Sequence, residues 1–420
     1  MGATRRTRLN LLLAALAVFA VAAVAVPRSA APLPAVAGAL PCTNGTTFDL
    51  RATTGRISTP DGGSVFMWGF AKNPGAFQMP GPILCVTQGS TVTVNLQNDL
   101  SEPVSIVFPG QTAVSSSGGS AGLLAQEAAA SGGSVSYTFL ASEPGTYLYE
   151  SGTSPHKQVQ MGLYGALVVR PTMGASYAYN DAATQFDPAR EYLLLMHDMD
   201  PDLHRAVERN EPYDITTKHD RYWTINGRSF PDTIAADGVA YLPSQPYGAL
   251  VRVRPSTGST LPALIRMANA GMSNHPFHPH GNHVRVIAQD GRLLGAGASL
   301  SYEQFTQTSG SGQTFDLLFR WTNVENWSTT HPIPVTLPQM RNLVFKDKVT
   351  WYSGSPYLGK KVKLPAGVVS FNRCGEYYYP WHSHALNEFQ NFDEGFGGLA
   401  TLLRVDPPLG QGTPPSCPGP

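Results

Sequence analysis

The sequence predicts an all-β protein built from β-sandwiches. Apolar residues make up 42% of its 420 residues, which is sufficient for a large core. Its 42 glycines and 35 prolines interrupt helices and suit many short strands joined by turns. Alternation of apolar and polar residues recurs along the chain, as in half-buried strands. At ~150 residues per domain, the length suggests two or three domains.

The first stretch is predicted to be an export signal. Arg5, Arg6 and Arg8 precede an apolar run over residues 11–26, and small residues follow. The basic segment partly resembles a twin-arginine signal. An uncleaved anchor is the alternative, but the run is at or below the ~17 residues that a spanning helix needs. We therefore expect residues 1–39 to be signal and linker, with cleavage before Leu40 and a periplasmic or extracellular product.

Strands are predicted wherever the alternation is clear. The segments with this pattern are 92–96, 135–139, 251–254 and 283–287, and a further firm strand is expected near 222–226. Turn residues separate these segments at short spacing. This pattern is typical of a sandwich rather than of β-α-β units.

Other segments are predicted to connect the strands. Residues 112–134, rich in Ser, Gly and Ala, are expected to form a loop or short helix. Charged residues and two prolines between 198 and 221 indicate a connector between domains. Few alternations occur over 322–369, which suggests an insertion with long loops. The segment from Asp406 onward is a Pro/Gly-rich tail without a core pattern.

The charge balance excludes some classes of partner. Lys and Arg number 29, Asp and Glu also number 29, and the formal net charge is zero. Nucleic-acid binding needs a basic surplus, so none is expected. After signal removal no apolar run is long enough for stable membrane insertion.

Four cysteines follow the predicted signal: Cys42, Cys85, Cys374 and Cys417. An even number in an exported chain indicates disulfides, with three alternative pairings. We expect one bridge to join Cys417, in the tail, to the first domain. None of the four is spaced as CxxC, so a thiolate metal site is not expected.

Six of the eleven histidines fall in two short groups. The first is His275-Pro276-Phe277-His278-Pro279-His280-Gly281-Asn282-His283, and the second is His382-Ser383-His384. On a strand, HxH spacing places both imidazoles on one face. Two such pairs can bring four nitrogen ligands together, and imidazoles suit copper and zinc. The alternative is a set of hydrogen-bonded histidines without metal.

These groups and several other motifs resemble the multicopper oxidases, the family that includes the laccases. The sequence His275-Pro276-Phe277-His278-Pro279-His280-Gly281 is similar to the family's HPxHxHG motif, and His382-Ser383-His384 stands where the family has HCH. Further similar segments are Pro80-Gly81-Pro82-Ile83, residues 88–92, 145–149, 158–169 and 226–232. The resemblance covers residues 48–405.

The resemblance implies two cupredoxin-like Greek-key sandwiches. We expect the first cupredoxin domain at 40–172, a connector at 173–221, and the second at 222–408 with the insertion at 322–369. Residues 409–420 then form the tail. Two-domain relatives assemble as homo-oligomers, but a homotrimer of this chain would carry the same first domain and restore no missing ligand.

The resemblance also implies that the blue copper site is lost. A Cys thiolate belongs at Ser383, and the site's second His belongs at Glu388. Of that site only His275 remains. A hydroxyl cannot replace a thiolate as a soft ligand.

Half of the family's three-copper cluster is also missing. The first-domain HxH pairs stand as Val107-Phe108-Pro109 and Glu150-Ser151-Gly152. His278, His280, His382 and His384 occupy the second-domain ligand positions. Four imidazoles can hold one copper, or zinc, at the interface between the domains. Glu150, His156 or His275 could add a ligand. The alternative is a metal-free polar cluster.

Two functions follow from the resemblance. The first is an exported copper-dependent oxidoreductase with one copper, oxidising a phenol or another small one-electron donor with dioxygen as oxidant. The second is a non-catalytic metal-binding or structural protein of the cell envelope. Other candidates are weaker and are expected to be structural: Asp198 and Asp200 beside His197, the Tyr377–Tyr379 run, and His204, His219, His283 and His331.

Overall fold

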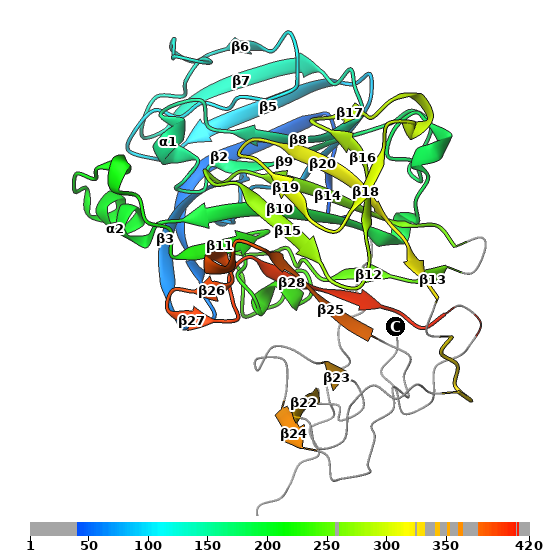
Figure 1. Ribbon diagram of the computed structural model, residues 1–420. Coiled ribbons are helices and arrows are strands. Elements are labelled where there is room, and N and C mark those ends of the chain that lie inside the picture. Colours follow the sequence, from blue (N-terminus) through cyan, green and yellow to red (C-terminus); the bar gives the residue numbers. More distant parts are fainter. Residues whose placement is uncertain are drawn as a thin grey trace, which may run out of the picture. The chain divides into compact units, whose positions relative to one another are not determined.

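The computed structural model describes residues 40–256, 260–323, 326–331, 341–344, 351–352, 360–363, 377–408 and 410 (Figure 1). Strands account for 43% of the chain and helices for 10%, which confirms the all-β prediction. The predicted export signal, most of the tail, Cys374 and Cys417 lie outside the described residues.

The N-terminal half forms a sandwich of two sheets. One sheet has the order β3-β2-β5-β7-β6 and the other has the order β1-β4-β9-β8. The strands are β1 (Thr43–Asn44), β2 (Thr47–Ser58), β3 (Ser64–Lys72), β4 (Leu84–Thr87), β5 (Thr91–Asn98), β6 (Ser115–Ser117), β7 (Gly133–Leu140), β8 (Gly145–Glu150) and β9 (Tyr164–Arg170).

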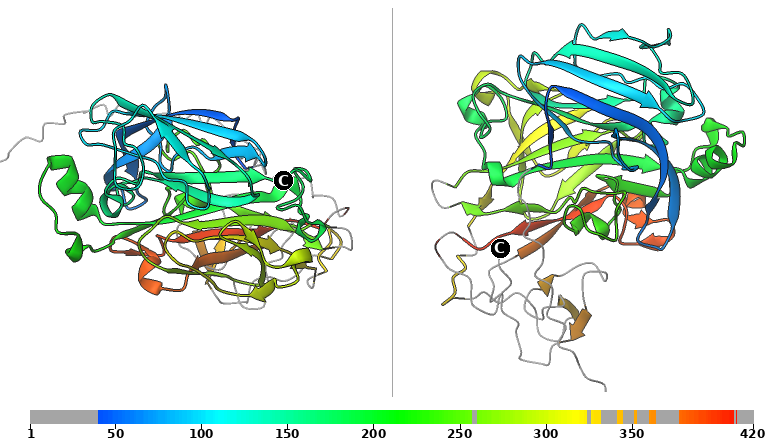
Figure 2. Two further views of the ribbon diagram at one scale, coloured as in Figure 1. Left: turned by 90° about the horizontal axis from the view of Figure 1, so that it is seen from above. Right: turned by 180° about the vertical axis from the view of Figure 1, so that it is seen from behind.

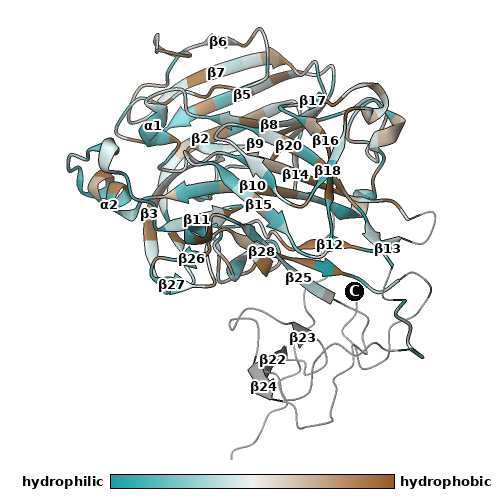
Figure 3. Ribbon diagram, viewed as in Figure 1, coloured by the Kyte–Doolittle hydropathy of each residue, from teal (hydrophilic) through white to brown (hydrophobic). Residues whose placement is uncertain are grey.

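Alternation explains why these segments are strands. Along β5, Val92, Val94 and Leu96 are buried while the residues between them are not. In Figure 3 the colour changes from residue to residue along β5 and β7, as expected for strands with one face in a core. The predicted strands at 92–96 and 135–139 are therefore confirmed.

The C-terminal half forms a second pair of sheets. One has the order β11-β10-β14-β20-β16-β17, with β18 on β16, and the other has the order β12-β28-β25-β15-β19. Their strands are β10 (Glu191–Met199), β11 (Tyr222–Ile225), β12 (Val251–Val253), β14 (Ala263–Asn269), β15 (His275–Pro279), β16 (Val284–Gln289), β17 (Arg292–Leu293), β18 (Tyr302–Gln304), β19 (Gln307–Ser309), β20 (Thr314–Phe319), β25 (Tyr377–Ser383) and β28 (Ala400–Val405).

Short strands complete the described part of the chain. They are β13 (Pro255–Ser256) with β21 (Trp321–Thr322), β26 (Gln390–Asn391) with β27 (Glu394–Gly395), and β22 (Arg341–Val344) with β23 (Trp351–Tyr352) and β24 (Lys360–Lys363). The last three lie within the predicted insertion at 322–369.

The two sandwiches share buried contacts. Seen from above, the blue and cyan strands of the first half lie over the green strands, and the red strands lie beyond these (Figure 2, left). One apolar cluster contains Leu148 and Val168 from the first half together with Leu195 and Ala268 from the second. Strands β8 and β20, which belong to different sandwiches, are joined by a hydrogen bond of 2.6 Å from Thr146 Oγ1 to Asp316 Oδ1.

The predicted connector at 173–221 contains regular structure. Its residues 191–199 form β10, which pairs in parallel with β14 and antiparallel with β11. A connector was predicted here because of the charged residues and prolines between 198 and 221. The run Leu193–Met196, however, is fully apolar and buried. We therefore propose that the second domain begins at β10, before residue 222.

Two α-helices lie in the described residues: α1 (Pro155–Gln158) and α2 (Pro201–Arg209). Short 3-10 helices occur as well, among them Pro188–Arg190. Asp200 caps α2 by accepting from the Asp202 amide, Pro201 suits the first turn, and Asn210 ends the helix at φ 54°. Neither helix has the length and apolar character needed to cross a membrane. Residues 112–134 form a loop with the short strand β6, and none of this segment is helical.

The cysteine prediction needs correction. Cys42 pairs with Cys85, across a sequence separation of 43 residues. Since β1 lies parallel to β4, Asn44 is opposite Cys85 and the two cysteines are brought together by sheet pairing. Neither cysteine is therefore available to fasten Cys417 to the first domain.

Candidate metal centre

The two histidine groups lie on neighbouring strands. β15 and β25 pair antiparallel, and His278 stands directly opposite His382. His280 and His384 lie two residues beyond these on each strand, so all four side chains belong to one face of the sheet. The alternation along β15 leaves His278 and His280 partly exposed while His275 and Phe277 on the other face are buried.

The four rings converge, as the sequence predicts. The centroid of the His278 ring is 4.9 Å from that of His280, 5.8 Å from that of His382 and 5.2 Å from that of His384. The His280 and His382 centroids are 5.1 Å apart, and those of His382 and His384 are 5.9 Å apart. Sheet pairing thus gathers residues that are about a hundred positions apart in sequence.

Backbone carbonyls orient two of the rings. His278 Nδ1 lies 2.6 Å from the Phe305 carbonyl oxygen and 3.0 Å from Thr306 Oγ1. His382 Nδ1 lies 2.7 Å from the Ser383 carbonyl oxygen. A carbonyl can only accept, so both Nδ1 atoms carry the proton and donate it. In the neutral rings Nε2 is then the atom with a lone pair, as a metal ligand requires.

The surroundings favour the neutral form of two of the rings, those of His280 and His382. Burial is the main cause that lowers the pKa of His382 to about 4, and the neighbouring His280, His278 and His384 lower it further. Burial, followed by His278 and His384, also lowers the pKa of His280. Neutral imidazoles are the form that binds metal, so the cluster is ready for a cation near neutral pH.

The fit to a metal ion is limited. His280 Nε2 and His382 Nε2 are 3.1 Å apart. Metal–nitrogen bonds of ~2.0 Å place two ligand nitrogens roughly 3 Å apart, so this pair has suitable spacing. Among the described residues, however, no three His, Cys, Asp or Glu side chains are already arranged around one metal position. The His280–His382 pair is therefore the part of the cluster whose nitrogens are already spaced for a shared ion.

A surface cavity of about 340 Å³ opens beside the cluster. His278 and His280 line it together with His283 and Phe305, and the His283 ring meets the Phe305 ring edge-on at 5.7 Å. All lining residues come from 278–305. This cavity therefore lies on the second sandwich.

The buried face of the same strands carries the residues at the positions where the family resemblance places a blue copper site. His275 is fully buried, and its Nδ1 donates to Glu388 Oε2 across 2.9 Å. Its Nε2 has no hydrogen-bond partner in the described residues. Ser383 is also buried, and its Oγ accepts from the Ala385 amide. A side-chain pair thus stands where the resemblance places copper ligands, and His275 faces away from the four rings.

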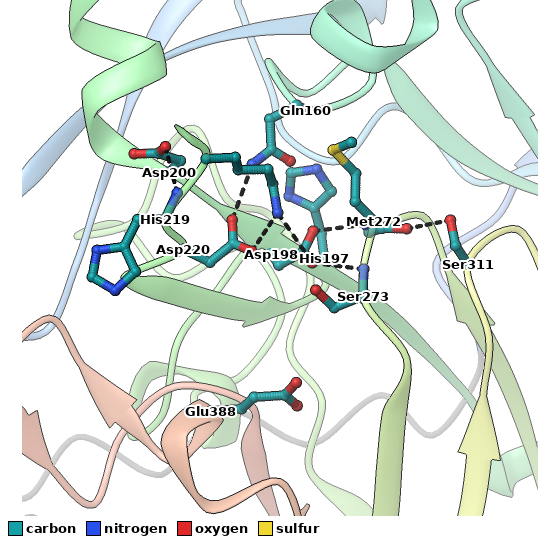
Figure 4. A network of polar contacts seen from close by, with 12 residues as sticks. Gln160, His197, Asp198, Asp200, His219, Asp220, Met272, Ser273, Ser311 and Glu388 are labelled. Carbon is teal, nitrogen blue, oxygen red and sulfur yellow. Dashed lines mark hydrogen bonds and ion pairs between the residues drawn. The ribbon is translucent and has the colours of Figure 1, made fainter. Parts of the chain in front are cut away.

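A buried polar network extends from this pair. Asp198 accepts hydrogen bonds from the amides of Met272, at 2.8 Å, and Ser273, at 2.9 Å. Lys218 Nζ lies 3.7 Å from Asp198 and forms an ion pair with Asp220. Figure 4 shows the carboxylates of Asp198 and Asp220 pointing into one space, with Gln160 beside Asp220 and Glu388 on the opposite side.

Charge balance governs this network. Burial would raise the pKa of Asp198, but Lys218, His197 and His275 lower it below its usual value. Burial, followed by repulsion from Asp198, raises the pKa of Asp220 to about 6. From the sequence, Asp198 is expected to be structural. Its buried role could not be found from sequence, because its partners lie up to 75 residues away.

The first-domain ligand positions are filled by packing. Val107 and Glu150 exchange backbone hydrogen bonds of 2.8 and 3.1 Å. A Cβ at Gly152 would stand 2.6 Å from the Val107 side chain. Burial raises the pKa of the Glu150 carboxyl. Glu150 and the exposed His156 of α1 therefore belong to the first sandwich, and neither lines the cavity beside the four rings.

The isolated histidines fall into a buried pair and an exposed pair. His197 and His204 are buried, and each has one ring nitrogen bonded to a carbonyl oxygen, that of Val159 at 3.2 Å and that of Phe66 at 2.6 Å. His219 and His331 are exposed. Residues missed by the sequence analysis are Phe305 and Thr306, which fix His278. No sequence signal identifies them, because they follow 27 residues later on a separate segment.

Comparison with known proteins agrees with this architecture. Residues 59–174 match the family model described as multicopper oxidase. Laccase-3 of Oryza sativa subsp. japonica is 27% identical over 249 residues, covering 57% of this chain and 39% of that protein. The copper resistance protein A homolog of Pseudomonas syringae pv. tomato is 29% identical over 157 residues, covering 37% and 24%. The chain thus aligns with less than half of the length of these relatives.

Solved structures share the fold over most of the chain. The blue copper oxidase of Nitrosomonas europaea has a TM-score of 0.56 at 20% identity, covering 85% of both chains. The copper nitrite reductase of the same organism has a TM-score of 0.51 at 17% identity, covering 90% of this chain and 98% of that one. At these identities the likeness concerns the cupredoxin-like fold alone.

Fold, motifs and sequence matches point in the same direction. The chain resembles the multicopper oxidases, since its residues 59–174 match the model of that family and laccases are among the proteins similar to it in sequence.

Proposed function

We propose that this protein is an exported oxidoreductase that binds one copper ion per chain through His278, His280, His382 and His384. The observation that carries the proposal is the convergence of four rings, two of which donate an Nδ1 hydrogen bond to a carbonyl oxygen. Copper bound there would supply a one-electron acceptor for a small donor such as a phenol, with dioxygen as oxidant. Zinc is the alternative ion for the same imidazoles, and it would supply no redox chemistry.

The residues of the chain define how a donor would reach this site. No thiolate stands at Ser383, and His275 is held by Glu388, so electrons would not pass through a blue copper relay. The donor would bind directly beside the rings, in the 340 Å³ cavity. Phe305 provides an aromatic wall there, with its ring edge-on to His278 at 5.7 Å.

Metal analysis and electron paramagnetic resonance of the copper-loaded protein test this function. We expect one non-blue copper per chain, and oxidation of a phenol that His280→Ala and His382→Ala abolish. The matched control is His219→Ala, since His219 is exposed and its side chain lies outside the four-ring cluster. Retention of both copper and activity in His382→Ala would remove the proposal.

A second function is favoured by the His275–Glu388 pair and by the packed first-domain positions. These replace copper ligands by hydrogen bonds and side-chain packing, as in a protein that keeps the fold without the reaction. In that case the protein would be a metal-binding or structural component of the envelope. Purified protein without stoichiometric metal and without oxidase activity after copper loading would favour this alternative.

Partners of the proposed enzyme are small molecules. The zero net charge gives no support for nucleic-acid binding. Export to the periplasm or beyond, and assembly as a homo-oligomer, belong to the same proposal. Size-exclusion chromatography with light scattering measures the assembly.

A further inference from the structure

Four arginines lie around one aspartate in the second sandwich, where β12 pairs with β28. Arg190 ends a 3-10 helix, Arg252 lies on β12, Arg254 follows that strand, and Arg404 lies on β28. Asp406 accepts from Arg190 Nη2 at 2.8 Å, Arg252 Nη2 at 3.0 Å and Arg404 Nε at 2.9 Å. We call these four arginines with Asp406 the arginine cluster.

Sheet register forces the arginines together. β12 and β28 are parallel, and Arg252 stands directly opposite Arg404. Arg254 lies two residues beyond Arg252 and therefore on the same face. Like charges directly opposite each other destabilise a sheet. Such an arrangement requires compensating negative charge.

Most of the cluster is buried, and Arg254 is partly exposed. The side chains of Arg190 and Arg252 are each 9% exposed and that of Asp406 is 1% exposed. Buried charged groups are normally paired and fully hydrogen-bonded. Water therefore screens the charges of Arg190 and Arg252 poorly.

Among the described residues, the carboxylates that contact these arginines do not balance their positive charge. Asp406 is shared by three of the arginines, and Asp187 lies 3.3 Å from Arg190 Nε. Even if Arg404 is set aside, Arg190, Arg252 and Arg254 bring three positive charges against these two carboxylates. Burial lowers the pKa of Arg254, and repulsion from Arg190 lowers it further.

Three buried donors also lack acceptors. Within the described residues, Arg190 Nη1, Arg252 Nε and Arg254 Nε have no hydrogen-bond partner and no access to solvent. A buried guanidinium N–H without an acceptor is costly, because it has lost its hydrogen bonds to water. The three atoms come from three different side chains, so an acceptor for them must offer several lone pairs.

We propose that the arginine cluster is a binding site for a small inorganic oxyanion, of the size and charge of phosphate or sulfate. Its oxygens would accept from the unpartnered guanidinium N–H groups and supply the missing negative charge. Guanidinium groups match tetrahedral oxyanions through paired, charge-assisted hydrogen bonds. The site is separate from the four histidine rings and is independent of the proposed oxidase function.

Isothermal titration calorimetry with sodium phosphate and sodium sulfate tests the site. The titrations use the full chain in chloride-free buffer at neutral pH and constant ionic strength. We expect one oxyanion per chain, and Arg254→Gln should weaken binding at least tenfold. Arg254 is the residue to change because it makes no recorded bond to Asp406. Arg209→Gln removes the same charge from an exposed position on α2 and should leave the affinity unchanged.

A second variant covers the case in which Arg254→Gln does not fold. Arg190→Lys keeps the positive charge but removes the planar fork of donors, so it should also weaken oxyanion binding while heat-induced unfolding stays cooperative. Two results would overturn the site. One is failure of both anions to bind to the unaltered chain, and the other is an unchanged affinity in the folded Arg254→Gln or Arg190→Lys variant.

Discussion

His275 and Glu388 are joined by a hydrogen bond of 2.9 Å between Nδ1 and Oε2, inside the core of the second sandwich. Glu388 stands at the position where the family resemblance places the second imidazole of a blue copper site. The chain therefore keeps one ligand of that site and satisfies it with a carboxylate. Asp198 is a further carboxylate near His275. Burial would raise the pKa of Asp198, but Lys218, His197 and His275 lower it.

We expect Glu388→Ala to lower the free energy of unfolding by about 1–3 kcal/mol, because His275 then has no acceptor for its buried Nδ1–H. Glu388→Gln keeps an accepting oxygen and should cost less. Urea unfolding followed by tryptophan fluorescence measures both. Glu394→Ala, at an exposed position, is the control. Equal stability of Glu388→Ala and the control would show that the pair is not stabilising.

The same pair predicts how a blue copper site could be restored. Ser383→Cys together with Glu388→His returns a thiolate and a second imidazole beside His275, the set that gives blue copper its colour. We expect an intense blue absorption, as in natural His₂Cys sites, only in the double variant after copper addition. If the double variant is colourless although it is folded and copper-loaded, the inner face does not preserve the ligand geometry.

Buried histidines predict a loss of stability in acid. Burial lowers the pKa of His197 to about 3 and that of His204 to about 4, from a usual value near 6.5. Their stabilising effect is thus complete above pH ~6.5 and is lost as the pH falls toward these folded values, by up to ~1.4 kcal/mol per pH unit for each proton. Urea midpoints at pH 7, 6 and 5 measure the change.

Asp220 has the opposite effect on stability in acid, so a variant at this position tests the assignment of the two histidines. Its pKa is raised to about 6, so it takes up a proton in the folded state at a pH where the unfolded chain has none. Asp220→Asn removes that effect, and stability should then fall more steeply between pH 6 and 5. A stability that stays level from pH 7 to 5 in Asp220→Asn would contradict the assignment of His197 and His204 as neutral core residues.

Loss of the Cys42–Cys85 disulfide should destabilise the first sandwich. The bridge closes a loop with a sequence separation of 43 residues. Chain-entropy arguments give about 4 kcal/mol for such a loop, and measured losses are commonly ~2–4 kcal/mol. Unfolding of Cys42→Ser/Cys85→Ser compared with the oxidised protein measures the loss. An unchanged midpoint would mean that the bridge does not constrain the unfolded chain.

Sequence patterns predicted the fold and the positions of the four rings well. Alternation identified β5, β7, β12 and β16, because half-buried strands repeat every two residues. HxH spacing on two strands placed the imidazoles on one face, and the observed register confirmed that they meet. These features depend on local periodicity, which a sequence displays directly.

Other features depend on distant contacts. The buried apolar run of β10 lies among charged residues, so the sequence pattern assigned it to the connector and did not reveal its pairing with β14. The bridge of Cys42 with Cys85 depends on the pairing of β1 and β4, which spacing alone does not show. The partners of Asp198 and His278 lie on segments that only the three-dimensional structure brings near.

His278 and His382 are paired across β15 and β25, so the candidate metal centre forms only when these two strands are in this register. Side chains alternate between the two faces of a strand, so a slip of one residue between β15 and β25 would turn one pair of imidazoles into the core. Partial melting of either strand would likewise disperse the ligands together rather than one at a time. An ion bound there would therefore stabilise the pairing of β15 with β25, and it would be released when that strand pair first opens.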